Sequence, residues 1–85
     1  EKEMIIVLNN DAYFINALTA IEDFNEYFSV KISDEEFDTI GGIIVHGFGR
    51  LPKVGESINI DNFIFKISEG NHRQVKSLEM QIISK

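Results

Sequence analysis

The residues that could do chemistry gather in one glycine-rich stretch, DTIGGIIVHGFGRLPKVGE, which runs from Asp38 to Glu56. It holds five of the six glycines and the only proline of the chain, together with Arg50. Glycine-rich turns at the start of a helix can hold a phosphate with their backbone N–H groups, and an arginine adds positive charge. The first question is therefore whether this stretch binds a nucleotide or shapes a helix and a turn.

The spacing of these glycines fits neither phosphate-binding motif. A P-loop reads G-x-x-x-x-G-K-[ST]; Gly42 and Gly47 have this spacing, but Phe48 and Gly49 stand where the lysine and the hydroxyl are needed. The dinucleotide fingerprint G-x-G-x-x-G starts at Gly47 but ends on Pro52. The sequence therefore contains neither motif.

Helical periodicity gives the same stretch a structural interpretation. Ile40, Ile44 and Phe48 recur every four residues and predict the buried face of a helix, with Asp38 as its N-cap and Gly49 as its end. An exposed helical glycine costs about 1 kcal/mol relative to alanine, so several of them suggest a surface that a partner approaches closely. The residues predicted outside the buried face, and proposed as a partner contact, are Gly42, Val45, His46 and Gly49. The partner would be a neighbouring domain, a second subunit or a flat ligand.

The residues before this stretch predict a strand and a helix. Ala12 to Asn16 is rich in aromatic and β-branched side chains, as is typical of a strand. Thr19 and Glu22 have the capping-box spacing and predict the start of a helix that ends near Ser29. The same pattern at residues 33–36 predicts one short helical turn.

After the stretch, the pattern changes to period two and predicts an antiparallel meander. Apolar residues alternate with polar ones from Ile58 to Ile82, and Asp61-Asn62 is suited to a tight hairpin turn. Together these elements predict an α+β fold: an antiparallel sheet of about four strands with two helices on one face. We expect residues 1–10 to be a lead-in segment or a first strand, and residues 11–85 to form the domain.

Length, charge and hydropathy argue against some classes of function. The 85 residues suffice for one domain, and the net charge of −6 makes nucleic acid a poor partner, because nucleic-acid binding relies on positive charge. No apolar run approaches the 18 or so residues that a membrane-spanning helix needs, so we expect no direct membrane insertion by this domain. The chain begins at Glu1 rather than methionine, and we expect it to be a piece of a longer protein.

Catalytic and metal-binding patterns are weak. His46 and His72 are far apart and belong to no metal motif, and the chain has no cysteine and no G-x-S-x-G nucleophile turn. The acidic residues from Asp34 to Asp38 lack the spacing of a calcium loop, so direct sensing of Mg²⁺ or Co²⁺ there is the weakest alternative. We predict no catalytic residue and no metal site, and expect that the chain is not an enzyme.

Three short motifs resemble those of a known family. D-T-[IL]-G-G is present from Asp38 to Gly42, G-R-[IL]-P-x-x-G-E from Gly49 to Glu56, and I-E-D-[LF]-N from Ile21 to Asn25. With these spacings the chain resembles the CorC/HlyC transporter-associated domain over nearly its whole length. The residues that carry the central motifs are Asp38, Thr39, Gly41, Gly42, Gly49, Arg50, Pro52 and Gly55.

The resemblance implies a fold and a setting. The fold would be similar to a subdomain of PCMH-type FAD-binding flavoproteins. The domain would be the C-terminal regulatory part of a magnesium and cobalt efflux protein or haemolysin-like protein, on the cytoplasmic side of the cell membrane. Its partners would be the CBS-domain pair and the membrane domain of the same parent chain, or a second copy in a homodimer.

One alternative function belongs to a different class. A flavin- or adenine-nucleotide-binding domain would use the glycine turn, with Gly49 and Arg50 as the binding residues. The chain has no P-loop and no tryptophan to anchor a flavin, so we expect no cofactor, with FAD or an adenine nucleotide as the alternative.

Overall fold

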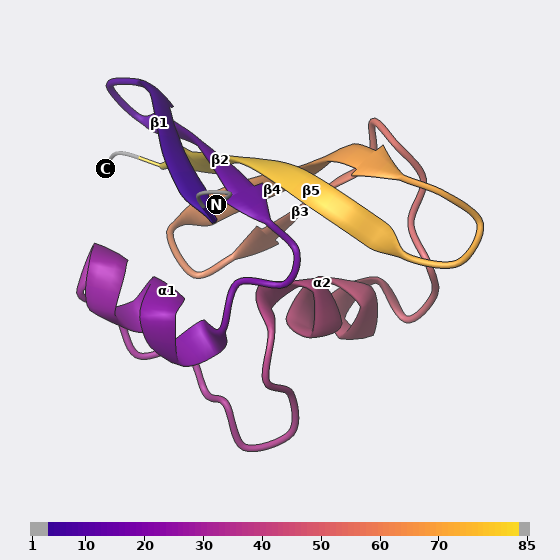
Figure 1. Cartoon of the computed structure of the whole chain (residues 1–85), viewed down its shortest axis with the longest axis horizontal. Helices are drawn as coiled ribbons and strands as arrows, with labels where there is room; N and C mark the ends of the chain where they lie inside the picture. Colours follow the sequence, from indigo (N-terminus) through magenta and orange to yellow (C-terminus); the bar gives the residue numbers. More distant parts are fainter. Residues whose placement is uncertain (1–3, 84–85) are drawn as a thin grey trace.

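A computed structural model describes residues 4–83, which fold into one sheet and two helices (Figure 1). In chain order the elements are β1 (Ile5–Asn9), β2 (Ala12–Asn16), α1 (Ile21–Phe28), α2 (Ile40–Phe48), β3 (Ser57–Ile60), β4 (Phe63–Gly70) and β5 (Val75–Ile82). The α+β class, the extent of β2 and the end of α1 agree with the sequence prediction. Neither helix is long and apolar enough to cross a membrane.

The strands form a single antiparallel sheet in the order β1-β2-β5-β4-β3. The prediction of about four strands is wrong by one, because residues 5–9 pair with β2 as a fifth strand at the sheet edge. Residues 1–3 of the expected lead-in lie outside the described residues. The hairpin between β3 and β4 turns at Asp61, whose φ of 55° is the left-handed conformation expected there.

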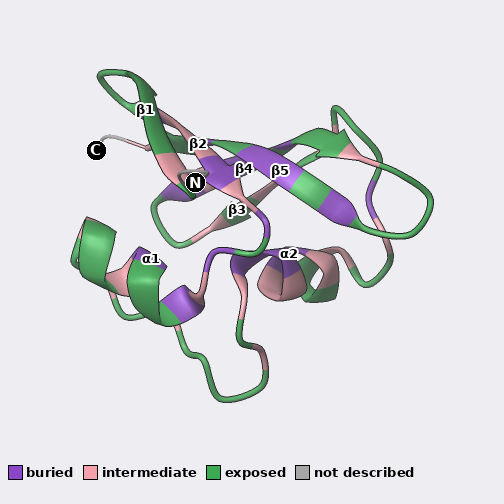
Figure 2. Cartoon of the chain, viewed as in Figure 1, coloured by how far each residue is buried: buried purple, intermediate pink, exposed green. Residues whose placement is uncertain are grey.

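Both helices cover the same face of the sheet (Figure 1). Ile21 and Phe24 of α1 and Ile40 and Ile44 of α2 are buried against the sheet (Figure 2). The Phe24 ring lies 5.4 Å from the ring of Phe63. The periodicity that predicted α2 therefore identified its buried face. The helix-free face of the sheet carries the alternate side chains of the same strands.

The predicted capping box at the start of α1 is wrong. The N-cap of this helix is Ala20, which makes no side-chain capping bond. Thr19 is buried instead, and its hydroxyl donates a 2.6 Å hydrogen bond to the carbonyl of Asn16. The hydroxyl closes the turn after β2, so it is not available to the helix.

The short helical turn predicted at residues 33–36 is also wrong, because this segment is irregular. The Ser33 hydroxyl accepts a long bond of 3.3 Å from the Glu35 N–H, and no helical turn follows. The segment is held from α1: the Asn25 amide donates to the carbonyl of Ile32 and accepts from its N–H, at 2.8 and 2.9 Å. This paired contact fixes the loop between the helices without a helical turn.

Candidate functional site

The N-terminus of α2 is capped by Thr39, one residue later than predicted. The Thr39 hydroxyl accepts a 3.2 Å hydrogen bond from the Gly42 N–H, as an N-cap residue should. Asp38 contributes its backbone: its carbonyl accepts a 2.9 Å bond from the Ile21 N–H at the start of α1. The prediction of Asp38 as the N-cap is therefore wrong, and this pair of residues ties the starts of the two helices together.

Gly41 permits a close approach between α2 and the turn after β2. Its N–H donates a 2.9 Å bond to the carbonyl of Ala17, and the residue is buried. A Cβ added to Gly41 would lie 2.9 Å from that carbonyl oxygen. The first glycine of the motif is therefore explained by packing against the chain's own backbone.

The proposed partner-contact face is partly covered by Phe37. The Phe37 ring lies 5.0 Å from the ring of His46, and a Cβ on Gly42 would lie 3.3 Å from Phe37. Val45 is half-buried against the core. Of the four residues predicted for this face, His46 and Gly49 are exposed. The sequence analysis missed Phe37. The signal that could have found it is an aromatic residue within an otherwise acidic segment.

The end of α2 is set by Gly49, as predicted. Gly49 has a φ of +72°, and its N–H donates to the carbonyls of Val45 and His46 at 3.0 and 3.1 Å. This is the left-handed C-cap for which glycine is favoured. The exit loop then passes the buried Pro52 and turns again at Gly55, whose φ is +98°.

Arg50 is held by Glu56, the last residue of the G-R-[IL]-P-x-x-G-E motif, to which the sequence analysis gave no structural role. Its guanidinium donates to both carboxylate oxygens of Glu56, one bond being 2.9 Å, and lies 5.6 Å from the centre of the Phe48 ring. The Glu56 carboxylate also accepts a 2.7 Å bond from the Lys53 N–H. The bonds from Arg50 and then Lys53 lower the pKa of Glu56 to about 2. The sequence analysis offered Arg50, with Gly49, as a binding residue for a flavin or nucleotide; in the structure its guanidinium closes the loop.

The glycine turn and Arg50 are poorly arranged to bind an anion. Gly49 lies at the C-terminus of α2, whose partial charge is negative, whereas phosphate sites use a helix N-terminus. The N–H groups of Gly41, Gly42, Gly49 and Gly55 are all bonded within the chain. Among residues 4–83, no group of three or more His, Asp or Glu side chains is placed to hold a metal ion.

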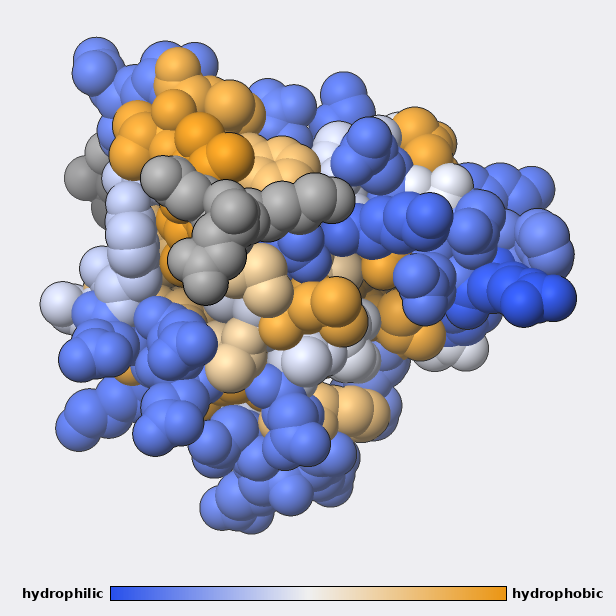
Figure 3. Space-filling model, viewed as in Figure 1, coloured by the Kyte–Doolittle hydropathy of each residue, from blue (hydrophilic) through white to orange (hydrophobic). Residues whose placement is uncertain are grey.

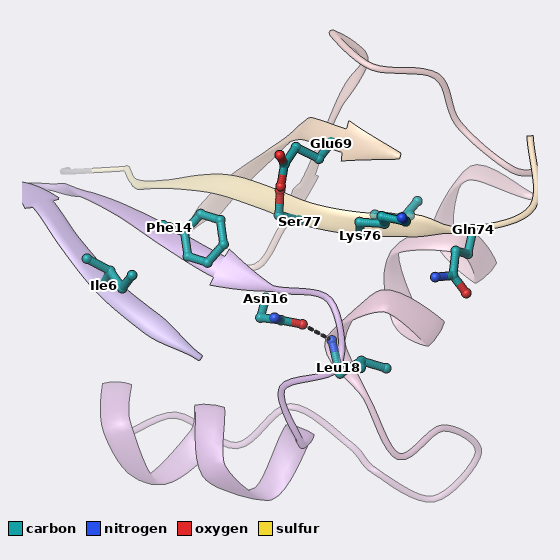
Figure 4. Close-up of a pocket in the computed structure, with 9 residues that line it drawn as sticks. Ile6, Phe14, Asn16, Leu18, Glu69, Gln74, Lys76 and Ser77 are labelled. Atoms are coloured by element: carbon teal, nitrogen blue, oxygen red, sulfur yellow. Dashed lines mark hydrogen bonds between the residues drawn. The ribbon is translucent and has the colours of Figure 1, made fainter. Parts of the chain in front are cut away.

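A separate hollow of about 520 Å³ lies on the helix-free face of the sheet (Figure 4). Ile6 and Phe14 pair across β1 and β2 in its wall, and Leu18, with 71% of its surface exposed, lines it from the turn after β2. The Asn16 side chain accepts a 2.9 Å bond from the Leu18 N–H and so fixes this turn. The rest of the lining is mostly polar (Glu69, Gln74, Val75, Lys76 and Ser77), and the sequence analysis did not predict this hollow.

The comparisons with known proteins agree with the family resemblance that the sequence motifs indicated. The model of the CorC_HlyC family, described as a transporter associated domain, matches residues 6–84. The chain belongs to the CorC_HlyC family. It is 48% identical, over 88% of its length, to the magnesium and cobalt efflux protein CorC of Buchnera aphidicola, and 43% identical over the same share to that of Escherichia coli. The chain spans 26% of the length of each of these two relatives.

Solved structures of CorC_HlyC domains have the same fold. A crystal structure of a CorC-associated region from Neisseria meningitidis superimposes with a TM-score of 0.92, at 32% identity, covering 95% of this chain and 100% of that one. A CorC_HlyC domain of a Xylella fastidiosa haemolysin, solved in complex with Mg²⁺ and Mn²⁺, superimposes with a TM-score of 0.83 over 96% of this chain and 100% of that one. Its identity is 20%, so it bears on the fold alone. The comparison with PCMH-type FAD-binding subdomains is not confirmed.

The structure assigns a role in the fold to residues of the CorC_HlyC motifs. Asp38, Thr39 and Gly41 join α2 to α1 and to the turn after β2. Gly49 ends α2, and Arg50 closes the exit loop. These motif residues maintain the fold, and their bonds run to other residues of the domain.

Proposed function

We propose that this chain is a non-catalytic accessory domain that modulates ion transport by a magnesium and cobalt efflux protein. The observation that carries the proposal is the family match over residues 6–84, together with 43–48% identity to relatives named CorC. The structure is compatible with it, because the motif residues serve the fold. The domain would lie on the cytoplasmic side of the membrane and contact the CBS-domain pair and membrane domain of its parent.

A transport measurement tests this role. The 85 residues would replace the matching segment of the Escherichia coli relative, and Mg²⁺ and Co²⁺ efflux would be compared with that of the native protein and of a variant lacking the segment. The chimaera should transport at a rate close to the native one. The variant without the domain should still transport, but at a changed rate or with a changed dependence on ion concentration. Unchanged transport after deletion would refute a modulating role.

The contact with the parent would use the α2 surface around Gly42, Val45, His46 and Gly49. His46 and Gly49 are its exposed members, and Phe37 extends it by packing on His46. Substitution of the half-buried Gly42 or Val45 would disturb packing inside the domain, so His46→Glu is the cleaner change. It should weaken association with the rest of the relative at least about tenfold, or about 1.4 kcal/mol. Gln81→Glu, the same new charge on an exposed residue of β5, is the control and should have no effect.

A further inference from the structure

A second hollow, of about 370 Å³, lies where the loop that leaves α2 meets the hairpin between β4 and β5. Leu51 to Val54 form one wall, and Gly70 to His72 form the other. The two segments lie at the same end of the molecule (Figure 1). This volume is near the lower end of the range for ligand pockets, about 300–1,000 Å³, so the hollow suits a side chain or two of a partner.

The wall contributed by the exit loop is apolar and partly exposed. Pro52 is buried and Leu51 is half-buried, while Val54 exposes 59% of its surface. Figure 3 shows a small hydrophobic patch, bordered by hydrophilic residues, at the end of the molecule where this loop and the hairpin lie. An apolar side chain of a partner would gain free energy by leaving water for this wall.

The rim of the hollow is positively charged. Lys53 and His72 line it, Arg73 follows in the same turn, and all three are exposed. None of the lining residues is Asp or Glu. The one ion pair among the described residues is that of Arg50 with Glu56, so Lys53 and Arg73 have no carboxylate partner in this part of the chain. Their charges are available to carboxylates of a partner.

The net charge of −6 does not oppose such a partner, because the acidic residues are concentrated elsewhere. Seven of the 14 Asp and Glu residues lie between Glu22 and Asp38, in α1 and the segment after it. α1 lies at the opposite end of the molecule from the hairpin (Figure 1), whose longest extent is 33 Å. Glu69, just before the hairpin turn, lines the other hollow. Since salt screens exposed charges beyond about 8 Å, the nearby cations determine which charge the hollow attracts.

The backbone donors of both walls are largely used within the chain. The N–H groups of Lys53, Gly55, Asn71, Arg73 and Gln74 all donate to carbonyls or to side chains of the chain itself. A compact oxyanion such as phosphate is usually held by several backbone N–H groups, and these are not available to it. Apolar contact and side-chain charge remain, and this combination suits an acidic peptide.

We propose that this hollow binds an acidic peptide segment of a partner protein, with one apolar residue in the hollow and carboxylates on both sides of it. The apolar residue contacts Leu51 and Val54, and the carboxylates pair with Lys53 and accept from the imidazole N–H of His72. The internal bonds hold both walls in place, so binding requires little further ordering of the chain. The contact is small, and we expect a dissociation constant on the order of 0.1–1 mM for an isolated peptide.

This contact is separate from the α2 surface and goes beyond the proposed transport role. A chain that binds the peptide but does not modulate transport would refute only the transport role. A chain that modulates transport without binding the peptide would refute only this contact.

Amide NMR titration of the 85-residue chain tests the proposal. The probe is a capped peptide in which glutamates flank one phenylalanine. Two matched peptides carry lysine in place of the glutamates, or serine in place of the phenylalanine. The acidic peptide should produce saturable shifts in residues 51–54 and 70–73, and higher ionic strength should weaken its binding. The lysine peptide should produce none, and the serine peptide should bind about tenfold more weakly.

Two substitutions separate the charge from the apolar contact. Lys53→Glu reverses a charge at the rim and should weaken binding about tenfold. Lys31→Glu, the same change at an exposed lysine after α1, is the control and should leave binding unchanged. Val54→Ser removes the exposed apolar side chain and should also weaken binding, with the amide spectrum of the rest of the chain preserved.

Three outcomes would overturn the proposal. The first is the absence of saturable shifts at about 5 mM of the acidic peptide. The second is equal binding of the lysine peptide, or shifts confined to residues outside the two walls. The third is binding that neither Lys53→Glu nor Val54→Ser weakens, which would assign the peptide to another surface.

Discussion

The guanidinium of Arg50 and the carboxylate of Glu56 form a two-bond ion pair across the loop that leaves α2. Both groups are partly exposed, with 56% and 31% of their side-chain surfaces accessible. The loop between them includes the buried Pro52 and the turn at Gly55. The arginine that the sequence analysis offered as an alternative nucleotide-binding residue therefore holds the connection between α2 and β3.

The first prediction concerns the protonation of Glu56. Its pKa of about 2 lies below the ordinary value of 4.5, so the pair stabilises the fold fully above about pH 4.5. That contribution is lost as the pH falls from there through 2, because the unfolded state takes up the proton first. Carboxyl NMR titration should give a midpoint near 2 for Glu56. Arg50→Ala should raise it toward 4.5, and Arg73→Ala, at an exposed arginine elsewhere, should not. A wild-type midpoint near 4.5 would contradict the ion pair.

The second prediction compares two glycines of α2. Gly41→Ala places a methyl group 2.9 Å from the backbone oxygen of Ala17, which cannot move freely, and should destabilise the fold by about 2 kcal/mol. Gly47→Ala meets only the terminal methyl group of Ile58, at 2.8 Å, and gains helix propensity. Its stability should stay within about 1 kcal/mol of the wild type. Urea unfolding measures the free energy of unfolding of both variants. Equal losses would show that the close approach of Gly41 to Ala17 is no more restrictive than that of Gly47 to Ile58.

How far the fold could be predicted is clearest from α2 and β2. Isoleucine and phenylalanine at helical spacing outweighed the β-branched run within α2, because one face of a helix must be apolar to be buried. The start of β2, at Ala12, coincides with a change from the turn residues Asn9, Asn10 and Asp11 to aromatic and β-branched ones. Both patterns are local, so the sequence contains the information they need.

The sequence predictions were wrong where contacts between segments distant in the sequence determine the local structure. Thr19 has the spacing of a cap, but burial in the turn after β2 directs its hydroxyl to Asn16. Whether residues 5–9 form a strand depends on pairing with β2, which no local pattern reveals. In the candidate site, Gly49 as the end of α2 was predictable. The pairing of Arg50 with Glu56 was not, because it depends on the path of the five loop residues between them.

The third prediction separates Asp38 from Thr39 at the start of α2. Thr39→Ala removes the oxygen that accepts from the Gly42 N–H and should cost about 1 kcal/mol of stability. Asp38→Ala leaves its carbonyl bond to the Ile21 N–H intact and should cost less than about 0.5 kcal/mol, for the loss of a charge near a helix N-terminus. Thr39→Ser should restore most of the stability. A larger loss for Asp38→Ala than for Thr39→Ala would reverse the assignment of the cap.

The last prediction concerns nucleotides and flavins at the glycine turn. The guanidinium of Arg50 is bonded to Glu56, and the N–H groups of Gly49 and Gly55 are bonded to carbonyls, so an incoming phosphate would have to displace existing contacts. Titration of the isotope-labelled chain with ATP, AMP and FAD should therefore produce no saturable amide shifts between Gly41 and Gly55. The same titration of Glu56→Gln tests the helix end separately. This variant removes the charge that pairs with Arg50 but leaves the C-terminus of α2 beside the guanidinium, so it too should give no saturable shifts. Saturable binding to the wild type that is lost in Arg50→Ala would instead make this loop a ligand site, because the arginine would have exchanged Glu56 for the phosphate.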